Sequence, residues 1–423
     1  MILTDQEKKM LDGEEGYPSQ KAMQILVQLG EIYDADRMIP VSKVHMPGSS
    51  VVVAGEAGTR LVEKMAAQGG HFRVFTTLNT GAVDMDHWSE IGYSRETYDM
   101  QQRLTRAYEK LGGLACHTCT PYFIGSIPRL GEHVAWGESS AIAFVNSVLG
   151  ARTNREGGPS ALAAALTGLA PNYGLHRQEN RYGQIHIKVA TSLNGAVDYG
   201  SLGYWVGRRT ESKIPVFTGI PKDVTTDQLK MLSAALASSG SVALFHIVGV
   251  TPEAADILTA FGGRQPLDVL TFDRSGLGES EGLLNKHQGQ AVSIVVIGCP
   301  HASIQEIESI ARLLGGKKVH DGMELWITAA QPTKAYAERC GFEGTIRSAG
   351  GRIVTDTCPI LSPMAYLAKA KNLKALATNS AKLAHYAPGQ WGMPTYYGSL
   401  EACILTAIDG VARTASLGEH HEG

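Results

Sequence analysis

The sequence predicts an α/β protein with a multi-domain core, in which parallel sheets are flanked by helices. Short apolar strands alternate with helical segments from about residue 240 onward, which is typical of a parallel sheet. The chain has 423 residues, enough for two or three domains. Hydrophobic residues make up 43% and charged residues 19%, so the chain can bury a large core.

The first part of the chain is expected to alternate between helices and short strands. Thr4 and Glu7 have the spacing of a capping box, and residues 19–33 carry apolar side chains at helical intervals. We predict that the valine-rich residues 49–58 form one of several short strands and loops. Residues 72–81 are predicted to be a strand that ends in a polar Asn-Thr-Gly loop.

Helices become more prominent in the next segment. The periodicity predicts a helix over 94–112, and residues 113–123 are expected to form a strand that leads into a loop. Residues 136–171 are rich in Ala, Gly and Ser. Because small side chains let helices pack closely, we expect buried helices beneath a site here.

Regular strand units fill the second half of the chain. A predicted strand is followed by a helix, or in one case by a proline-containing turn, in each of the units 241–263, 293–316, 324–341, 352–360 and 373–388. Ligands gather beyond the carboxyl ends of parallel strands. Cys299, Cys358 and the loop 378–380 lie at such ends, whereas Cys340 lies late in a helix. Ser303 and Glu306 have the spacing of a capping box.

Charge and hydropathy exclude several classes of partner. Lys and Arg number 38 against 41 Asp and Glu, so neither a nucleic acid nor an anionic membrane is expected as the main partner. No apolar run reaches the ~20 residues that cross a bilayer, and the charged N-terminus lacks the apolar stretch of a signal peptide. We therefore expect a cytoplasmic protein. We also expect an N-terminal region at about 1–235, a second region of regular strand-helix units at 236–415, and a loose tail at 416–423.

Six cysteines offer several kinds of chemistry. Disulfides are not expected in a reducing cytosol. Cys116 and Cys119 form a CxxC, which is weak evidence for a redox pair or a zinc site because no helix start and no second pair accompany it. Cys119, Cys299 and Cys358 each end a strand-like run at a turn with proline nearby. Three such thiolates could hold an iron–sulfur cluster with one open iron, which would act as a Lewis acid on a hydroxyl. The alternative is that they are small buried hydrophobic groups.

Five motifs stand in order along the chain: CTPYFIG, GEHVAWGESSA, NSVLGARTNREGGPSALAAALTG, IGCPHAS and ATNS. With these motifs the sequence resembles the aconitase X family, large-subunit type, over nearly its whole length. The family belongs to the aconitase superfamily, whose enzymes dehydrate or isomerise hydroxy acids at an iron–sulfur centre. The resemblance implies an aconitase-like core with its site in the central cleft.

The same resemblance implies a metal centre and a partner. It implies that the metal ligands are Cys119, Cys299 and Cys358. It leaves packing roles for Cys116, Cys340 and Cys403. A 4Fe-4S cluster with one open iron is expected, with 2Fe-2S or mononuclear iron as alternatives because family members differ. Some members fuse a small swivelling domain to the core, and this chain has no room for one. A separate small subunit would then close the cleft and supply a serine base.

Candidate substrate contacts lie in the loops. The turn formed by Gly48, Ser49 and Ser50 could hold an anionic group through its N–H groups and hydroxyls, or could be a plain turn. Asn79 and Thr80 follow a predicted strand. The side-chain amide of Asn79 could offer a directional hydrogen bond to the substrate, or it could close an Asx-turn.

Two further groups complete the expected site. Glu138 and Ser139 begin a helix, so Ser139 is expected to cap it, while Glu138 could orient the leaving hydroxyl or relay a proton. Lys382 lies in the first turn of a helix, against the dipole, and could pair with an anionic end of the substrate or stay in solvent.

Other polar residues beside the motifs are less clearly assigned. Arg152, Asn154 and Arg155 could equally bind a carboxylate or tie loops together. Three histidines, His45, His133 and His301, are treated as structural because a lone histidine is usually a hydrogen-bonded structural group.

The sequence thus predicts a hydro-lyase that removes water from a β-hydroxy acid. Family members act on cis-3-hydroxy-L-proline or on mevalonate 5-phosphate. We favour hydroxyproline as the substrate because no P-loop pattern or dense basic cluster is present. Two other classes stay open, an iron–sulfur regulator that binds RNA and a zinc-stabilised interaction protein.

Overall fold

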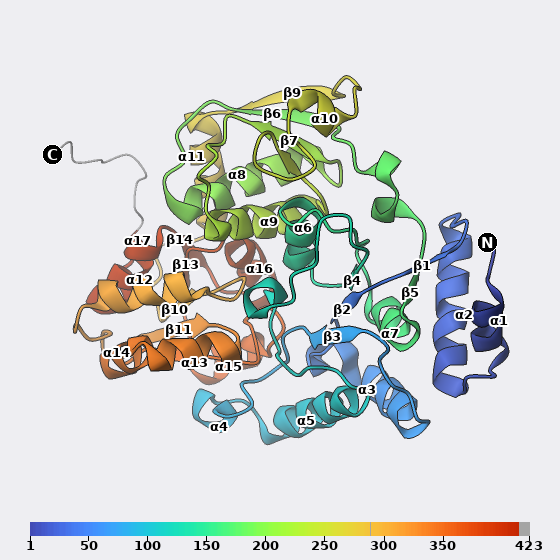
Figure 1. The fold of residues 1–423 in the computed structure, drawn as a ribbon. Coiled ribbons are helices and arrows are strands. Elements are labelled where there is room, and N and C mark those ends of the chain that lie inside the picture. The colour runs from blue at the N-terminus through green and yellow to red at the C-terminus, as the bar shows by residue number, and fades with distance from the viewer. Residues whose placement is uncertain (288, 414–423) are drawn as a thin grey trace.

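The computed structural model describes residues 1–287 and 289–413 and contains four sheets (Figure 1). Three of the four sheets are entirely parallel, as the sequence predicted. Figure 1 shows the four-stranded sheet at the top in green and yellow and the five-stranded sheet in orange at the lower left. The blue strands of a three-stranded sheet lie at the lower right.

The first region combines a small parallel sheet with helices. Its strand order is β3-β2-β4, with β2 at Lys43–Met46, β3 at Phe75–Leu78 and β4 at Ala135–Trp136. A separate antiparallel pair joins β1 (Met38–Pro40) to β5 (Leu169–Pro171). The α-helices here are α1 (Asp5–Asp12), α2 (Tyr17–Ile32), α3 (Val51–Ala67), α4 (Trp88–Ile91), α5 (Arg95–Lys110), α6 (Ser139–Ser147) and α7 (Gly158–Thr167). Short 3-10 turns are η1 (Pro121–Ile124), η2 (Gly174–His176) and η3 (Gln178–Asn180).

The middle region is a four-stranded parallel sheet of order β8-β7-β6-β9. Its strands are β6 (Ile185–Val189), β7 (Pro215–Thr218), β8 (His246–Ile247) and β9 (Asp268–Phe272). Its helices are α8 (Gly195–Thr210), α9 (Thr226–Gly240), α10 (Ile257–Phe261) and α11 (Arg274–Leu284). A Cβ added to Gly203 of α8 would lie 2.7 Å from the carbonyl oxygen of Leu232 of α9, so the close packing of these two helices requires glycine.

The last region is a five-stranded parallel sheet of order β12-β11-β10-β13-β14. Its strands are β10 (Ile294–Ile297), β11 (Glu324–Thr328), β12 (Arg352–Val354), β13 (Leu376–Thr378) and β14 (Thr395–Tyr397). Its helices are α12 (Ile304–Leu314), α13 (Gln331–Arg339), α14 (Phe342–Ala349), α15 (Met364–Ala370), α16 (Ala381–Trp391) and α17 (Leu400–Asp409). The central strand β10 is completely buried, which explains its unbroken run of branched apolar residues.

Several predicted elements differ from the structure. Residues 49–58 are not a strand, because the valine run begins α3, whose N-cap Ser50 accepts a hydrogen bond from the backbone N–H of Val52. Residues 113–123 form no strand either and make only a single bridge between Leu114 and Thr77. Several further elements, among them β6, β7, α8, α9, β9, α11, β14 and α17, were not predicted from the sequence.

Other predictions are confirmed. Both capping boxes, at the starts of α1 and α12, are present, and α6 and α7 are buried, alanine-rich helices. Within the described residues, no helix combines the length and apolarity that a bilayer crossing requires. The division near residue 235 stays a prediction, and that residue lies inside α9. The predicted tail at 416–423 lies outside the described residues.

Candidate active site

The carboxyl ends of strands from two sheets surround one cavity of ≈ 340 Å³. Its lining contains nine of the eleven predicted site residues, namely Gly48, Asn79, Thr80, Cys119, Glu138, Ser139, Cys299, Cys358 and Lys382. The segments that follow β2, β3 and β4 contribute from the first region. The segments that follow β10, β12 and β13 contribute from the last region. The cavity therefore lies at the site that the parallel-sheet rule predicts.

The three predicted ligand thiols are buried in the wall of this cavity. Burial raises the pKa of Cys119, Cys299 and Cys358, and that of Cys299 reaches about 12. The charge of Cys358 contributes to the pKa shifts of the other two, so Cys358 lies within electrostatic range of both. The thiols are therefore neutral when nothing is bound, and a metal must displace their protons.

The donor set fits a cluster better than a single ion. In residues 1–287 and 289–413, no three His, Cys, Asp or Glu side chains are already arranged to hold one metal ion. Thiolates on one ion lie about 2.3 Å from it and hence no more than ~4.6 Å apart. A cluster holds its cysteines on separate metal atoms and accepts a wider spacing. Three thiols from three loops around one cavity are a donor set that such a cluster can use.

Lys382 is buried and paired, not solvated. Its Nζ donates to Glu138 Oε1 at 2.7 Å and to Ser140 Oγ at 2.8 Å, so α16 and α6 are joined across the cavity wall. Burial alone would raise the pKa of Glu138, but the charge of Lys382 and the backbone N–H of Ala141 hold it below its usual value. Burial would likewise lower the pKa of Lys382, and the Glu138 carboxylate raises it. Both groups are therefore charged at neutral pH.

The start of α6 corrects the predicted capping. Glu138 is the N-cap, and its carboxylate accepts from the backbone N–H of Ala141 at 2.7 Å. Ser139 is the first helical residue, and its hydroxyl donates to Glu138 Oε1 at 3.3 Å. Glu138 thus caps the helix with one oxygen and holds Lys382 with the other.

The Gly48 turn presents backbone atoms to the cavity, not hydroxyls. Ser49 donates to the Asn79 carbonyl at 2.6 Å, Ser50 donates to the Leu361 carbonyl at 2.7 Å, and neither lines the cavity. Gly48 has a left-handed φ of 71° and lines the cavity. Among the described residues, none accepts a hydrogen bond from the backbone N–H groups of positions 48–50. Successive free N–H groups of this kind attract anions.

Asn79 and Thr80 link the first region to the cysteine loops. Both are buried and line the cavity. The Thr80 hydroxyl lies 3.4 Å from the sulfur of Cys358, although the two residues are 278 positions apart in the sequence. A hydroxyl at this distance contributes to orienting the thiol.

Other candidate residues lie outside the cavity. Arg155 donates to the Ser241 carbonyl, Asn154 donates to the Tyr173 carbonyl at 3.1 Å, and Arg152 donates to the His176 carbonyl at 3.2 Å, so all three tie loops together. Cys116 and Cys403 are buried, as expected of packing groups. The packing role predicted for Cys340 is wrong, because that residue is exposed at the end of α13.

Sequence reasoning missed two polar lining residues on α16. Tyr386 and Gln390 follow Lys382 at intervals of four residues and line the same cavity. This spacing places all three on one face of a helix. The interval could have been read from the sequence once Lys382 had been assigned. Val53, Ile360 and Leu361 add an apolar side to the cavity.

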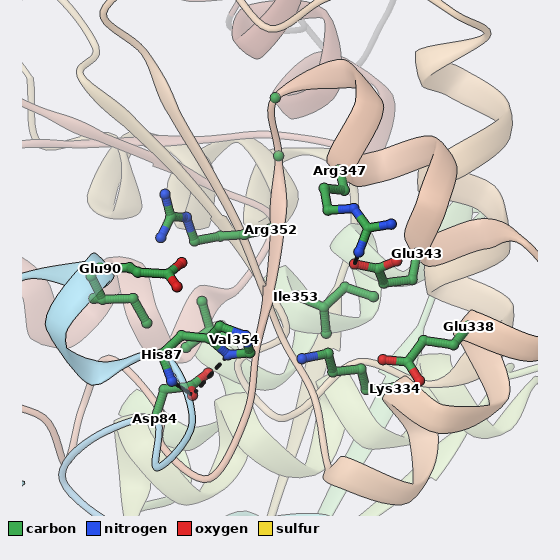
Figure 2. A pocket seen from close by; sticks show the side chains of 13 residues that line it. Asp84, His87, Glu90, Lys334, Glu338, Glu343, Arg347, Arg352, Ile353 and Val354 are labelled. Carbon is green, nitrogen blue, oxygen red and sulfur yellow. Dashed lines mark hydrogen bonds and ion pairs between the residues drawn. The ribbon is translucent and has the colours of Figure 1, made fainter.

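A second cavity of ≈ 480 Å³ lies between α4 and the helices α13 and α14 (Figure 2). Three basic side chains, Lys334, Arg347 and Arg352, line it together with four carboxylates, Asp84, Glu90, Glu338 and Glu343. Asp84 is fully buried at its wall and receives N–H groups from His87 and Thr355. The cavity contains none of the predicted site residues, and its carboxylates outnumber its basic groups, which does not favour an anionic substrate.

Gly137 tests whether the shape of the Gly48 turn matters. A Cβ at Gly137 would lie 2.1 Å from Cγ of Pro47, so Gly137→Ala must displace the turn. We expect destabilisation of about 1–3 kcal/mol in thermal melting and a severalfold rise in KM. Gly158→Ala is the control, because its Cβ would lie 3.9 Å from the Pro47 carbonyl oxygen, an ordinary contact. An unchanged KM for Gly137→Ala would contradict this role of the turn.

Three family models match successive parts of the chain. They describe the aconitase X first domain at residues 1–179, the second domain at 183–281 and the third domain at 292–409. The chain belongs to the aconitase X family. These matches coincide with the three regions that hold the three-, four- and five-stranded sheets.

Relatives support the same assignment. The phosphomevalonate dehydratase large subunit of Methanothermobacter thermautotrophicus is 41% identical over 92% of this chain and 95% of that protein. The cis-3-hydroxy-L-proline dehydratase of Pseudomonas aeruginosa is 36% identical over 96% of this chain and 69% of that protein. Both are dehydratases, so this aconitase X protein is a hydro-lyase. Neither an RNA-binding regulator nor a zinc-stabilised interaction protein is named among these relatives.

A solved structure agrees with the fold. The holo-form of Thermococcus kodakaraensis aconitase X superposes with a TM-score of 0.87 at 38% identity, and the match covers 96% of this chain and 100% of that one. The predicted fold, an aconitase-like core of parallel sheets flanked by helices, is therefore confirmed.

Proposed function

We propose that this chain is the large subunit of a phosphomevalonate dehydratase. The observation that carries the proposal is the pattern of relatives. Five proteins with this name are 34% to 41% identical, and the chain covers 95% to 100% of each. Two cis-3-hydroxy-L-proline dehydratases are 35% and 36% identical, and the chain covers 69% of each. The hydroxyproline substrate that the sequence favoured is thus less well supported than mevalonate 5-phosphate.

The Gly48 turn supports a phosphorylated substrate. The sequence contains no P-loop pattern and no dense basic cluster, which disfavoured a phosphorylated substrate. A turn with free backbone N–H groups can hold a phosphate without either. In this proposal the turn holds one anionic end of the substrate, and Val53 and Leu361 contact its apolar middle.

Glu138 and Lys382 act on the departing hydroxyl and on the negative charge that develops in the cavity. A β-hydroxy acid loses a proton from the carbon next to the carboxylate and hydroxide from the following carbon, which yields a conjugated double bond and one water. The ionised Glu138 is positioned to orient the departing hydroxyl by accepting its hydrogen bond, or to relay to that hydroxyl the proton that the base takes from the carbon. Lys382 keeps Glu138 ionised between turnovers and stabilises negative charge in the cavity. Asn79 and Ser139 orient the substrate.

Cys119, Cys299 and Cys358 would hold a cluster, which would supply a Lewis acid to the leaving hydroxyl. A 4Fe-4S centre with one open iron suits this donor set. All six cysteines are free thiols, which suits a cytoplasmic enzyme.

A separate small subunit completes the site in this proposal. Five of the relatives are themselves named large subunits. The partner carries the swivelling domain, closes the cavity and supplies the serine base that takes the proton. The large subunit alone should then bind the cluster but show no turnover.

The test is anaerobic co-expression with the small subunit, followed by assays of three compounds. Mevalonate 5-phosphate should form an ultraviolet-absorbing unsaturated acid. Unphosphorylated mevalonate is the matched control and should lose at least ~100-fold in kcat/KM, because the phosphate contacts are missing. Turnover of cis-3-hydroxy-L-proline alone would overturn the proposal.

A further inference from the structure

One histidine that the sequence indicated to be structural connects all three cysteine loops. His301 is completely buried, two residues after Cys299. Its Nδ1 lies 3.1 Å from the Thr118 hydroxyl, next to Cys119. Its Nε2 lies 2.9 Å from the Thr357 carbonyl, next to Cys358. The two contacts span 183 and 56 positions of sequence.

The backbone of His301 is fixed as firmly as the ring. Its N–H donates to the sulfur of Cys119 at 3.2 Å. Its carbonyl accepts from Nζ of Lys230 at 3.3 Å, and Lys230 is completely buried and paired with Glu306 in the first turn of α12. All four polar atoms of His301 are therefore engaged, and three of them contact residues of the Cys119 and Cys358 loops.

The partners also define the tautomer. The Thr357 carbonyl can only accept, so Nε2 carries the proton. In the neutral ring Nδ1 then accepts from the Thr118 hydroxyl. An imidazole in this state is a rigid spacer with one donor and one acceptor on opposite sides, which a shorter or flexible side chain cannot reproduce.

We propose that His301 is a positioning residue, which holds the Cys119, Cys299 and Cys358 loops at the spacing that one metal centre requires. The inference deepens the proposed function and rests on its assignment of these cysteines as ligands. His301 does not touch the substrate cavity. It acts through the thiols, as residues behind a metal ligand commonly do.

The experiment compares His301→Leu and His301→Gln with His246→Leu. His246 is a matched control, because it is buried and its Nε2 lies 2.7 Å from the Arg181 carbonyl, but it belongs to the middle sheet and contacts no cysteine loop. His301→Leu removes both ring contacts and keeps the volume. His301→Gln can restore the contact with Thr357 and should recover part of any loss.

Two measurements are made on each protein. In the metal-free state, the alkylation rates of the individual cysteines are followed by mass spectrometry. We expect Cys119 and Cys358 to react at least ~10-fold faster in His301→Leu than in the wild type or His246→Leu, with Cys403 unchanged. After anaerobic reconstitution, iron and sulfide per chain should fall at least ~5-fold in His301→Leu only, with the visible spectrum altered in His301→Gln.

The outcomes separate this inference from the proposed function. Wild-type alkylation rates and full iron content in His301→Leu would overturn the positioning role. A wild type that takes up no iron would overturn the proposed centre, whereas the alkylation rates would still decide the role of His301 in the loops. If His301→Leu does not fold, the same two measurements on His301→Gln decide.

Discussion

Cys299→Ala should remove the metal centre and reduce dehydratase activity by at least ~1,000-fold. Cys299 is buried in the wall of the cavity, on the loop after β10, beside Cys358 and Lys382. With one of three ligands missing, the remaining two thiols cannot retain a cluster under dilution. The measurement is iron and sulfide per chain after anaerobic reconstitution, together with turnover in the presence of the small subunit. Cys119→Ala and Cys358→Ala should behave in the same way.

Cys403→Ala is the matched control for this loss. Cys403 is buried and its pKa is raised to about 12 by burial, as for Cys299, but it lies on α17 and does not line the cavity. Its replacement removes a buried thiol and should cost only the small free energy of a core cavity. Retention of full iron content by Cys299→Ala would refute the ligand assignment. Equal iron loss in Cys403→Ala would show that the effect is general destabilisation.

The second large effect concerns the buried pair of Lys382 and Glu138. Their side chains are 9% and 8% exposed, so Lys382→Met leaves a carboxylate in the wall without its counter-charge. Breaking a buried pair in this way costs about 3–5 kcal/mol. We expect a large fall in the melting temperature and a raised pKa for Glu138, since Lys382 no longer holds the ionised form. Turnover should fall to background.

A double-mutant cycle separates stability from catalysis. Glu138→Gln keeps the shape of the carboxylate but cannot exchange a proton, and it should lower kcat by about 100- to 10,000-fold. Glu138→Gln combined with Lys382→Met removes both charges, so the melting temperature should recover most of the loss seen in Lys382→Met. Activity should not recover. A double variant that regains turnover would contradict the chemical role given to this pair.

The local sequence pattern predicted much of the candidate site. Cys299, Cys358 and Lys382 follow apolar strands. A residue that follows a strand so closely must lie near the end of that strand, so its place at the edge of the sheet can be predicted from the local sequence. The capping boxes at Thr4 and Ser303 are likewise local, because their bonds span three residues. The family motifs then supported Cys119, Glu138 and Ser139, although the loop of Cys119 does not follow a regular strand.

Only the tertiary structure decided how these groups meet. The valine run after Ser50 favours a strand by propensity, yet its N-cap and its packing make it a helix. Glu138 and Lys382 are separated by 244 positions, and His301 contacts partners 183 and 56 positions away. Such pairings depend on how the sheets are placed against one another, which no periodicity or short motif encodes. The sequence by itself therefore determined which residues could do chemistry, and the packing of the two sheets determined which of them act together.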